Sequence, residues 1–97
     1  MEIDFWNNLE KNRYEAVLEK KVIGVAKYSF LPNFVLAITS TEVRSEYEGQ
    51  GIAAQMIKGL LEYAQFYGYK INPICSYARV YINEHSEYKD MLATNID

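Results

Sequence analysis

The sequence predicts an α+β fold with a mainly antiparallel sheet and the element order β-β-β-α-β-α. Segments rich in β-branched and aromatic residues dominate the chain up to Val43. From Ile52 the apolar residues recur every three or four positions, as on one face of a helix. A short apolar run then separates this helix from a second one. Strands grouped at the front and a helix crossing to a fourth strand are typical of this class.

Three strands are predicted before the first helix. The segment Arg13–Glu19 alternates apolar and polar side chains, as a half-buried strand does. The segments Val22–Phe30 and Phe34–Val43 are rich in residues that favour strands. Short breaks at Lys20–Lys21 and Leu31–Asn33 join the three segments, which indicates an antiparallel meander.

The second half of the chain predicts a helix, a strand and a shorter helix. Ile52–Tyr67 carries one apolar stripe, and Gly68 is a typical C-terminal stop. Tyr69–Cys75 predicts a short strand, and Ser76–Glu84 has helical spacing. Because no repeat, low-complexity tract or linker interrupts this pattern, we expect residues 1–97 to form a single domain.

Composition excludes several classes of protein. The formal net charge of −3 and the lack of a Lys or Arg cluster argue against a nucleic-acid partner. No apolar run reaches the roughly 20 residues that span a bilayer, so we expect no membrane segment. The start of the chain lacks the features of a secretory signal, and a lone Cys75 cannot form an internal disulfide. We therefore expect a cytoplasmic protein, and we predict no metal site.

The stretch EYEGQGIAAQM places Gly49 and Gly51 at the mouth of the predicted helix. A glycine loop that opens onto a helix offers free backbone N–H groups and the positive end of the helix dipole to an anion. The missing Cβ atoms also let the backbone approach a ligand. Phosphate is the favoured ligand, and a plain turn is the alternative, because neither a Walker lysine nor a complete Gly-x-Gly-x-x-Gly is present.

The segment TEVRSEYEGQGIAAQMI resembles motif A of the GNAT superfamily of N-acetyltransferases, whose usual form is Arg/Gln-x-x-Gly-x-Gly/Ala. The resemblance implies a GNAT-like fold in which this loop, between the third strand and the first helix, holds the pyrophosphate of acetyl-CoA. Gly51 and Ala53 match the motif, whereas Glu48 stands at its basic or amide position. A carboxylate repels pyrophosphate unless it points into solvent. Nearby compensation is expected from Arg44, Lys58 or Arg79.

The resemblance implies cofactor contacts from the end of the third strand, from the loop and from the second helix. The expected residues are Val43, Arg44, Glu48, Gly49, Gln50, Gly51, Ile52, Ala53 and Tyr77. The sheet is expected to part between the third and fourth predicted strands, where the pantetheine arm enters.

The segment INPICSYARVYINEHSEYKDM is similar to the tail of a short GNAT branch with a Pro-x-Cys-Pro-Phe-like segment and a later His-Pro-Glu-Tyr. Cys75 and His85 are the counterparts here, and the two motifs together are more specific than either alone. Members of this branch also tend to have Thr-His-Thr-Glu-Val before the loop. This chain has Ser40 where that histidine would stand.

Two residues are catalytic candidates. Cys75 is either a small buried hydrophobe with an inert thiol or, as the resemblance implies, a cysteine near the acetyl group. Its predicted place at a helix start lowers a thiol pKa and favours thiolate. Glu42 is either a solvated strand residue or a base that acts through water. His85 lies ten residues beyond Cys75 and is expected at a helix end or on the surface.

The sequence therefore predicts a small N-acetyltransferase that binds acetyl-CoA and transfers the acetyl group to a primary amine. The acceptor is a small molecule or a protein lysine, and the amine attacks directly or after transfer to Cys75. The alternative, motivated by Glu48 and Ser40, is a non-catalytic acyl-CoA-binding or protein-interaction module on the same fold. We expect a monomer or a weak dimer.

Overall fold

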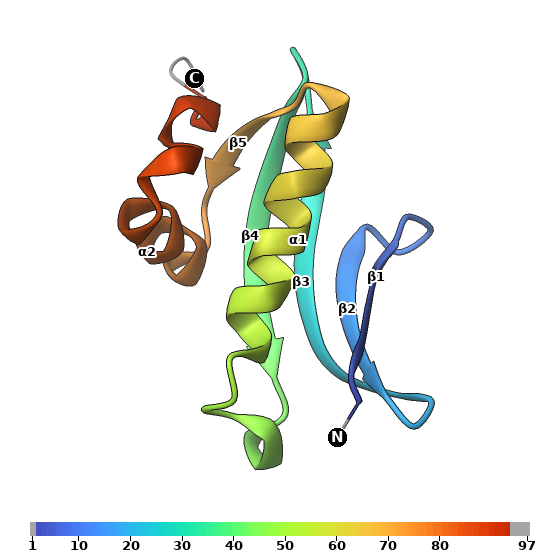
Figure 1. Cartoon of the computed structure of the whole chain (residues 1–97). Coiled ribbons are helices and arrows are strands. Elements are labelled where there is room, and N and C mark those ends of the chain that lie inside the picture. The colour runs from blue at the N-terminus through green and yellow to red at the C-terminus, as the bar shows by residue number, and fades with distance from the viewer. Residues whose placement is uncertain (1, 94–97) are drawn as a thin grey trace.

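A five-stranded sheet in the order β1-β2-β3-β4-β5 forms one layer, and α1 packs across it (Figure 1). The computed structural model describes residues 2–93. Its elements are β1 (Asp4–Asn8), β2 (Arg13–Leu18), β3 (Lys21–Leu31), β4 (Val35–Val43), the 3₁₀ turn η1 (Ser45–Tyr47), α1 (Ile52–Tyr67), β5 (Lys70–Pro73), α2 (Ser76–Glu84) and the 3₁₀ segment η2 (Ser86–Met91). The first four strands are antiparallel, and β5 runs parallel to β4.

The predicted α+β class and the order of the predicted elements are confirmed, and one further strand precedes them. β1 pairs with β2 so that Phe5 lies opposite Ala16. Its sequence, DFWNN, contains Asp and two Asn, which are depleted in strands. The pairing with β2 therefore provides the stabilisation that local strand propensity does not, and the sequence analysis did not predict this strand.

The strand β5 is shorter than the predicted Tyr69–Cys75. It ends at Pro73, which has no N–H to donate to a ladder. Its last pairing joins Pro73 to Ile38, and the N–H of Cys75 donates to the Ile38 carbonyl at 2.9 Å. The remainder of β4 extends past the end of β5 as a free edge.

A β-bulge in β4 lies at the same point. Lys27 pairs with Ser40 and Tyr28 pairs with Ile38, so Thr39 is an extra residue in β4. The Thr39 hydroxyl donates to the Lys27 carbonyl at 3.2 Å. A bulge bends its strand and increases the local twist. The strands β4 and β5 therefore diverge where their pairing stops.

The core lies between the sheet and the two helices. The buried residues of α1 are Ile52, Met56, Ile57, Leu60, Leu61 and Ala64. They form one apolar cluster with buried residues of the strands and with Ala78, Tyr81 and Ile82 of α2. On the opposite face of the sheet, Trp6, Lys27 and Glu42 are exposed. Among residues 2–93, no helix has the length and apolar content to cross a bilayer.

The packing of α1 on β2 gives a prediction about Gly59. A Cβ atom added there would collide with the ring and hydroxyl of Tyr14. We expect Gly59→Ala to destabilise the protein by about 1–3 kcal/mol through overpacking, although alanine favours a helix by about 1 kcal/mol. Urea unfolding measures the change. In a Tyr14→Ala background the same substitution should be stabilising, and an equal effect in both backgrounds would show that this contact is absent.

Candidate functional site

The loop between β4 and α1 is built on two glycines in the left-handed region. Gly49 has φ 81° and Gly51 has φ 79°. Side chains strain this conformation, so the turn itself requires glycine. A Cβ atom at either position would meet no protein atom within 4 Å. The glycines therefore leave open space beside the backbone instead of relieving contact with another part of the chain.

The loop leaves a set of backbone donors without protein acceptors. The N–H groups of residues 49–54 make no hydrogen bond within the described part of the chain, and no side chain caps α1. The first helical bond runs from the Gln55 N–H to the Gly51 carbonyl at 3.1 Å. Unpaired N–H groups at a helix start carry partial positive charge. This end of α1 is therefore suited to bind an anion.

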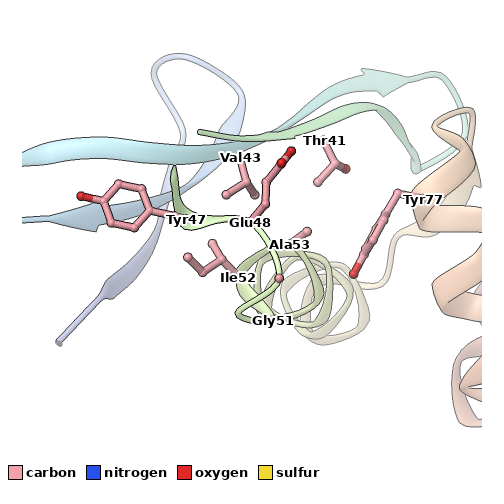
Figure 2. Close-up of a pocket in the computed structure, with 9 residues that line it drawn as sticks. Thr41, Val43, Tyr47, Glu48, Gly51, Ile52, Ala53 and Tyr77 are labelled. Atoms are coloured by element: carbon pink, nitrogen blue, oxygen red, sulfur yellow. The ribbon is translucent and has the colours of Figure 1, made fainter. Parts of the chain in front are cut away.

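A pocket of about 410 Å³ lies between this loop, β4 and the start of α2 (Figure 2). Its lining residues are Thr41, Val43, Tyr47, Glu48, Gly49, Gly51, Ile52, Ala53 and Tyr77. The Glu48 carboxylate points toward β4, between Val43 and Thr41, and Tyr77 lies beside α1 on the side away from Tyr47 (Figure 2). Among these lining residues, Glu48 is the only one with a charge. The backbone thus offers positive potential while the nearest side chain is negative.

Cys75 lies where β5 gives way to α2, beside Thr41, which lines this pocket. Its Sγ atom is 3.4 Å from the Thr41 hydroxyl oxygen. Partial burial is the largest influence on this thiol and by itself raises its pKa. Hydrogen bonds from the Thr41 hydroxyl and from the first N–H groups of α2, with the charge of Arg79, outweigh burial and lower the pKa below its ordinary value. The structure therefore makes this thiol easier to deprotonate than an ordinary cysteine.

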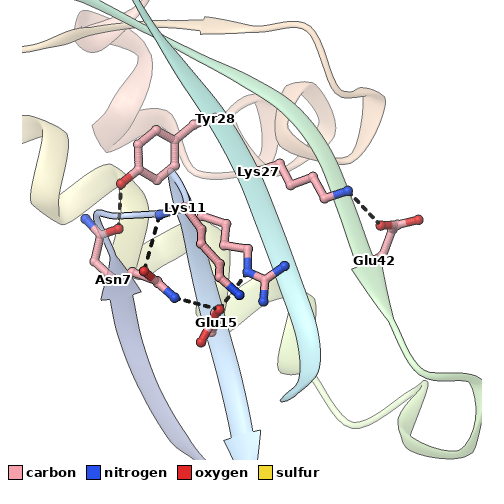
Figure 3. A network of polar contacts seen from close by, with 8 residues as sticks. Asn7, Lys11, Glu15, Lys27, Tyr28 and Glu42 are labelled. Carbon is pink, nitrogen blue, oxygen red and sulfur yellow. Dashed lines mark hydrogen bonds and ion pairs between the residues drawn. The ribbon is translucent and has the colours of Figure 1, made fainter.

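Several predicted residues lie outside the pocket lining. Glu42 points to the opposite face of β4, where its carboxylate is 3.9 Å from the Lys27 ammonium and its side chain is 69% exposed (Figure 3). Arg44 lines a separate shallow hollow between the start of β3 and the end of β4. Gln50 and Lys58 are exposed and do not line the pocket. The structure therefore brings the glycine loop, Val43 and Tyr77 together and leaves these four residues apart.

The remaining basic candidate is engaged elsewhere. Arg79 donates from Nη1 to the Ile74 carbonyl at 2.8 Å and to the Pro73 carbonyl at 3.4 Å. These bonds tie α2 to the end of β5. Arg79 acts on the thiol through its charge and does not offset Glu48 inside the pocket.

Two lining residues, Thr41 and Tyr47, were not predicted from the sequence. Thr41 is two positions before Val43 on β4 and therefore shares its face, which strand alternation could have indicated. Tyr47 lies in η1, whose conformation the sequence pattern did not reveal.

His85 matches its expected place at a helix end. It follows the last residue of α2, its Nδ1 lies 2.8 Å from the Tyr81 carbonyl oxygen, and its ring stacks on Tyr81 at 3.9 Å. These contacts hold His85 against its own helix.

A glycine loop with unpaired donors, a β4 edge that β5 leaves free and a thiol beside that edge together suit an anionic, extended ligand laid along the sheet edge. A sequence model of the GCN5-related N-acetyl-transferase family matches residues 13–91. The chain belongs to this family, which confirms the GNAT resemblance. No curated protein sequence matches the chain.

Solved structures share the fold at low sequence identity. One is the solution structure of a GCN5-like protein of Staphylococcus aureus, whose N-acetyltransferase activity is inferred. It is 23% identical to this chain with a TM-score of 0.73, and the match covers 96% of this chain and 90% of that one. An acetyltransferase of Elizabethkingia anophelis with acetyl-CoA bound is 22% identical with a TM-score of 0.58, over 76% of this chain and 51% of that one.

A ribosomal-protein-alanine N-acetyltransferase of Brucella melitensis is 19% identical with a TM-score of 0.61, over 88% of this chain and 63% of that one. This chain therefore spans about half to two thirds of the length of these two larger acetyltransferases.

The Thr41 contact predicts how the reactivity of Cys75 depends on pH. A hydroxyl that donates to the thiolate stabilises the charged form, so Thr41→Val should raise the thiol pKa. The rate of alkylation by iodoacetamide, measured against pH, should then reach its half-maximum at higher pH than in the unmodified protein. Thr39→Val is the matched control, because the Thr39 hydroxyl bonds the Lys27 carbonyl instead. Coincident profiles for Thr41→Val and the unmodified protein would contradict the contact.

Proposed function

We propose that the chain, as a single domain, is an N-acetyltransferase that takes its acetyl group from acetyl-CoA and transfers it to a primary amine. One observation carries the proposal. The loop with unpaired N–H groups at residues 49–54 lines a pocket, and another lining residue, Thr41, contacts a thiol of lowered pKa. An anionic head and a reactive tail are the two parts that such a pocket suits.

Apart from Glu48, the residues of the pocket fit coenzyme A. The left-handed loop at Gly49 and Gly51 would hold the pyrophosphate through backbone N–H groups, with open space on its outer side. The free edge of β4 beyond Ile38 offers backbone N–H and C=O groups to the amides of the pantetheine arm. Val43, Ile52 and Ala53 supply apolar walls. Acetyl-CoA, when bound, supplies a thioester whose carbonyl carbon is open to attack by an amine.

The chain contributes positioning and a nucleophile. Fixed backbone donors need no reorganisation when they bind an anion, so the loop can anchor one end of the substrate while the other end reacts. On a direct route, Cys75 is a bystander and the amine attacks the thioester. On a covalent route, the Cys75 thiolate attacks the carbonyl, the coenzyme leaves as a thiol after gaining a proton, and the amine then displaces Cys75.

The acceptor side is proposed on the opposite face of β4. Glu42 is exposed there, away from the pocket. Its carboxylate would attract a protonated amine in competition with the Lys27 ammonium 3.9 Å away, and would accept a proton from the amine through water. A small amine and a protein lysine both carry the primary amine that this step requires.

A titration with acetyl-CoA tests the proposed cofactor site. We expect micromolar binding by calorimetry, and we expect Gly51→Gln to abolish it, because a side chain at φ 79° strains the loop and fills the open space. Gly68→Gln is the matched control. Gly68 has φ 80° and an equally open Cβ position, but it lies at the other end of α1. No heat at millimolar acetyl-CoA, or equal loss in both variants, would contradict the site.

The rival function is a non-catalytic binding module, and the position of Glu48 favours it. Its carboxylate lines the pocket that a pyrophosphate would approach. Glu48→Gln in the same titration separates a chain that binds acetyl-CoA from a protein-interaction module whose site Glu48 closes to the coenzyme. For an acetyltransferase it should tighten binding by about threefold to tenfold at low salt, an advantage that salt reduces. Binding that appears only in Glu48→Gln would support the rival function.

The covalent route makes Cys75 essential to turnover. We expect Cys75→Ala to lower kcat by at least about 1,000-fold while leaving acetyl-CoA binding within about threefold. Acetylated Cys75 should accumulate in rapidly quenched reactions, as peptide mass spectrometry would show. A Cys75→Ala variant with unchanged turnover would remove the covalent route and leave direct attack.

A further inference from the structure

The end of the molecule opposite the glycine loop carries a continuous group of aromatic side chains, which we call the aromatic end. Its members are Phe30, Phe34, Tyr63, Phe66, Tyr67 and Tyr69. Tyr69 is central, with ring centroids 5.3 Å from Phe30 and 6.2 Å from Phe34. Phe66 is 81% exposed, Phe34 70% and Tyr67 59%. Contiguous exposed apolar surface of this kind marks an interaction site.

Folding does not explain the exposed aromatic side chain at position 34. Phe34 has φ 57°, in the left-handed region where a bulky residue is an outlier. Asn33 before it has φ 66°, which asparagine tolerates better. A glycine at position 34 would form the same turn without strain and without exposing a ring. The ring therefore adds neither core packing nor a better turn.

The aromatic end is electrically neutral. Residues 28–41 and 63–69 contain no charged side chain, although 24% of the chain is charged. Beside the rings is a hollow of about 260 Å³ lined by Gln65, Gly68, Tyr69, Lys70, Asp90 and Met91. Its two charged residues are one lysine and one aspartate. The surface thus combines protruding rings with a hollow, and its border has no excess of either charge.

We propose that the aromatic end binds a second copy of this chain about a two-fold axis. In such an interface the same surface serves both copies, so protruding Phe34 and Phe66 of one copy pack at the hollow of the other. The Lys70 and Asp90 border is self-complementary, because each charge meets its opposite across the axis.

The exposed area suits a weak dimer. An aromatic residue buries about 150–250 Å², so the exposed parts of the three most exposed rings amount to about 400 Å² per copy. Neighbouring residues would bring this toward the roughly 800 Å² per partner of a standard interface. A lipid surface fits less well. Membrane-surface segments join apolar side chains to an excess of Lys and Arg, which this neutral border on a chain of net charge −3 lacks.

The proposal is independent of the acetyltransferase function. The 16 residues of α1 separate Gly51 from Gly68 by about 24 Å. The glycine loop and the aromatic end therefore lie at opposite ends of the molecule (Figure 1). In a dimer formed at the aromatic end, the pocket beside the glycine loop of each copy would lie at the outer end of that copy.

Sedimentation equilibrium of the whole chain, from about 10 µM to about 1 mM, tests the proposal, since weak interfaces dissociate in this range. We expect a reversible dimer. Phe66→Glu and Phe34→Gly should each raise its dissociation constant by at least about tenfold. Both are tolerated by the fold, because Phe66 is exposed and glycine suits φ 57°. Val80→Glu is the matched control, an exposed apolar residue of α2 that should leave the dimer unchanged.

Three results would overturn the proposal. The first is a monomer at every concentration. The second is a dimer that both aromatic variants leave intact, which would place the interface elsewhere. The third is a monomer that co-sediments with phosphatidylcholine vesicles and loses this binding in Phe66→Glu, which would assign the surface to a membrane.

Discussion

The site depends on one constraint, the end of the pairing between β4 and β5. Pro73 has no N–H, so the ladder stops beside Ile38, and the Thr39 bulge bends β4 at the same point. If the pairing continued, the β4 edge would be saturated and Cys75 would be a ladder residue. Because it stops, the chain turns into α2, and the thiol reaches Thr41 instead. The end of the backbone pairing therefore creates the pocket, and the surrounding side chains only modify its shape and charge.

The second constraint is the placement of α1. Its buried stripe fixes the helix against the sheet, and left-handed glycines at both ends fix where the chain enters and leaves it. The entry at Gly51 leaves N–H groups unpaired, whereas at the exit the Tyr69 N–H bonds the Ala64 carbonyl at 2.8 Å. Glycine thus ends the helix at Gly68, whereas at Gly51 glycine leaves a set of backbone donors exposed.

Most of the fold could be predicted because its signals are local. The apolar stripe of α1, the glycines and the β-branched segments are visible in sequence. The strand β1 could not be predicted, because its DFWNN sequence forms a strand only through pairing with β2. In the site, the motif gave the loop, Val43 and Tyr77. Strand alternation alone could have put Glu42 on the face opposite Val43. The motif could not place Arg44 outside the pocket or bring Thr41 to Cys75, because these depend on contacts between residues distant in sequence.

The direction of Glu48 decides the electrostatics of the pocket. A helix start supplies the equivalent of about half a positive charge, which a full carboxylate close to it outweighs. In this structure the carboxylate points toward β4, between Val43 and Thr41, and away from the start of α1 (Figure 2). It therefore occupies the path along the strand and leaves the donors of residues 49–54 open. An anion at the helix start is compatible with this arrangement, whereas a ligand extending along β4 requires the exposed Glu48 side chain to turn toward solvent. With Glu48 in this rotamer the pocket admits only an anionic head. With the Glu48 side chain turned toward solvent, the pocket would admit the whole coenzyme.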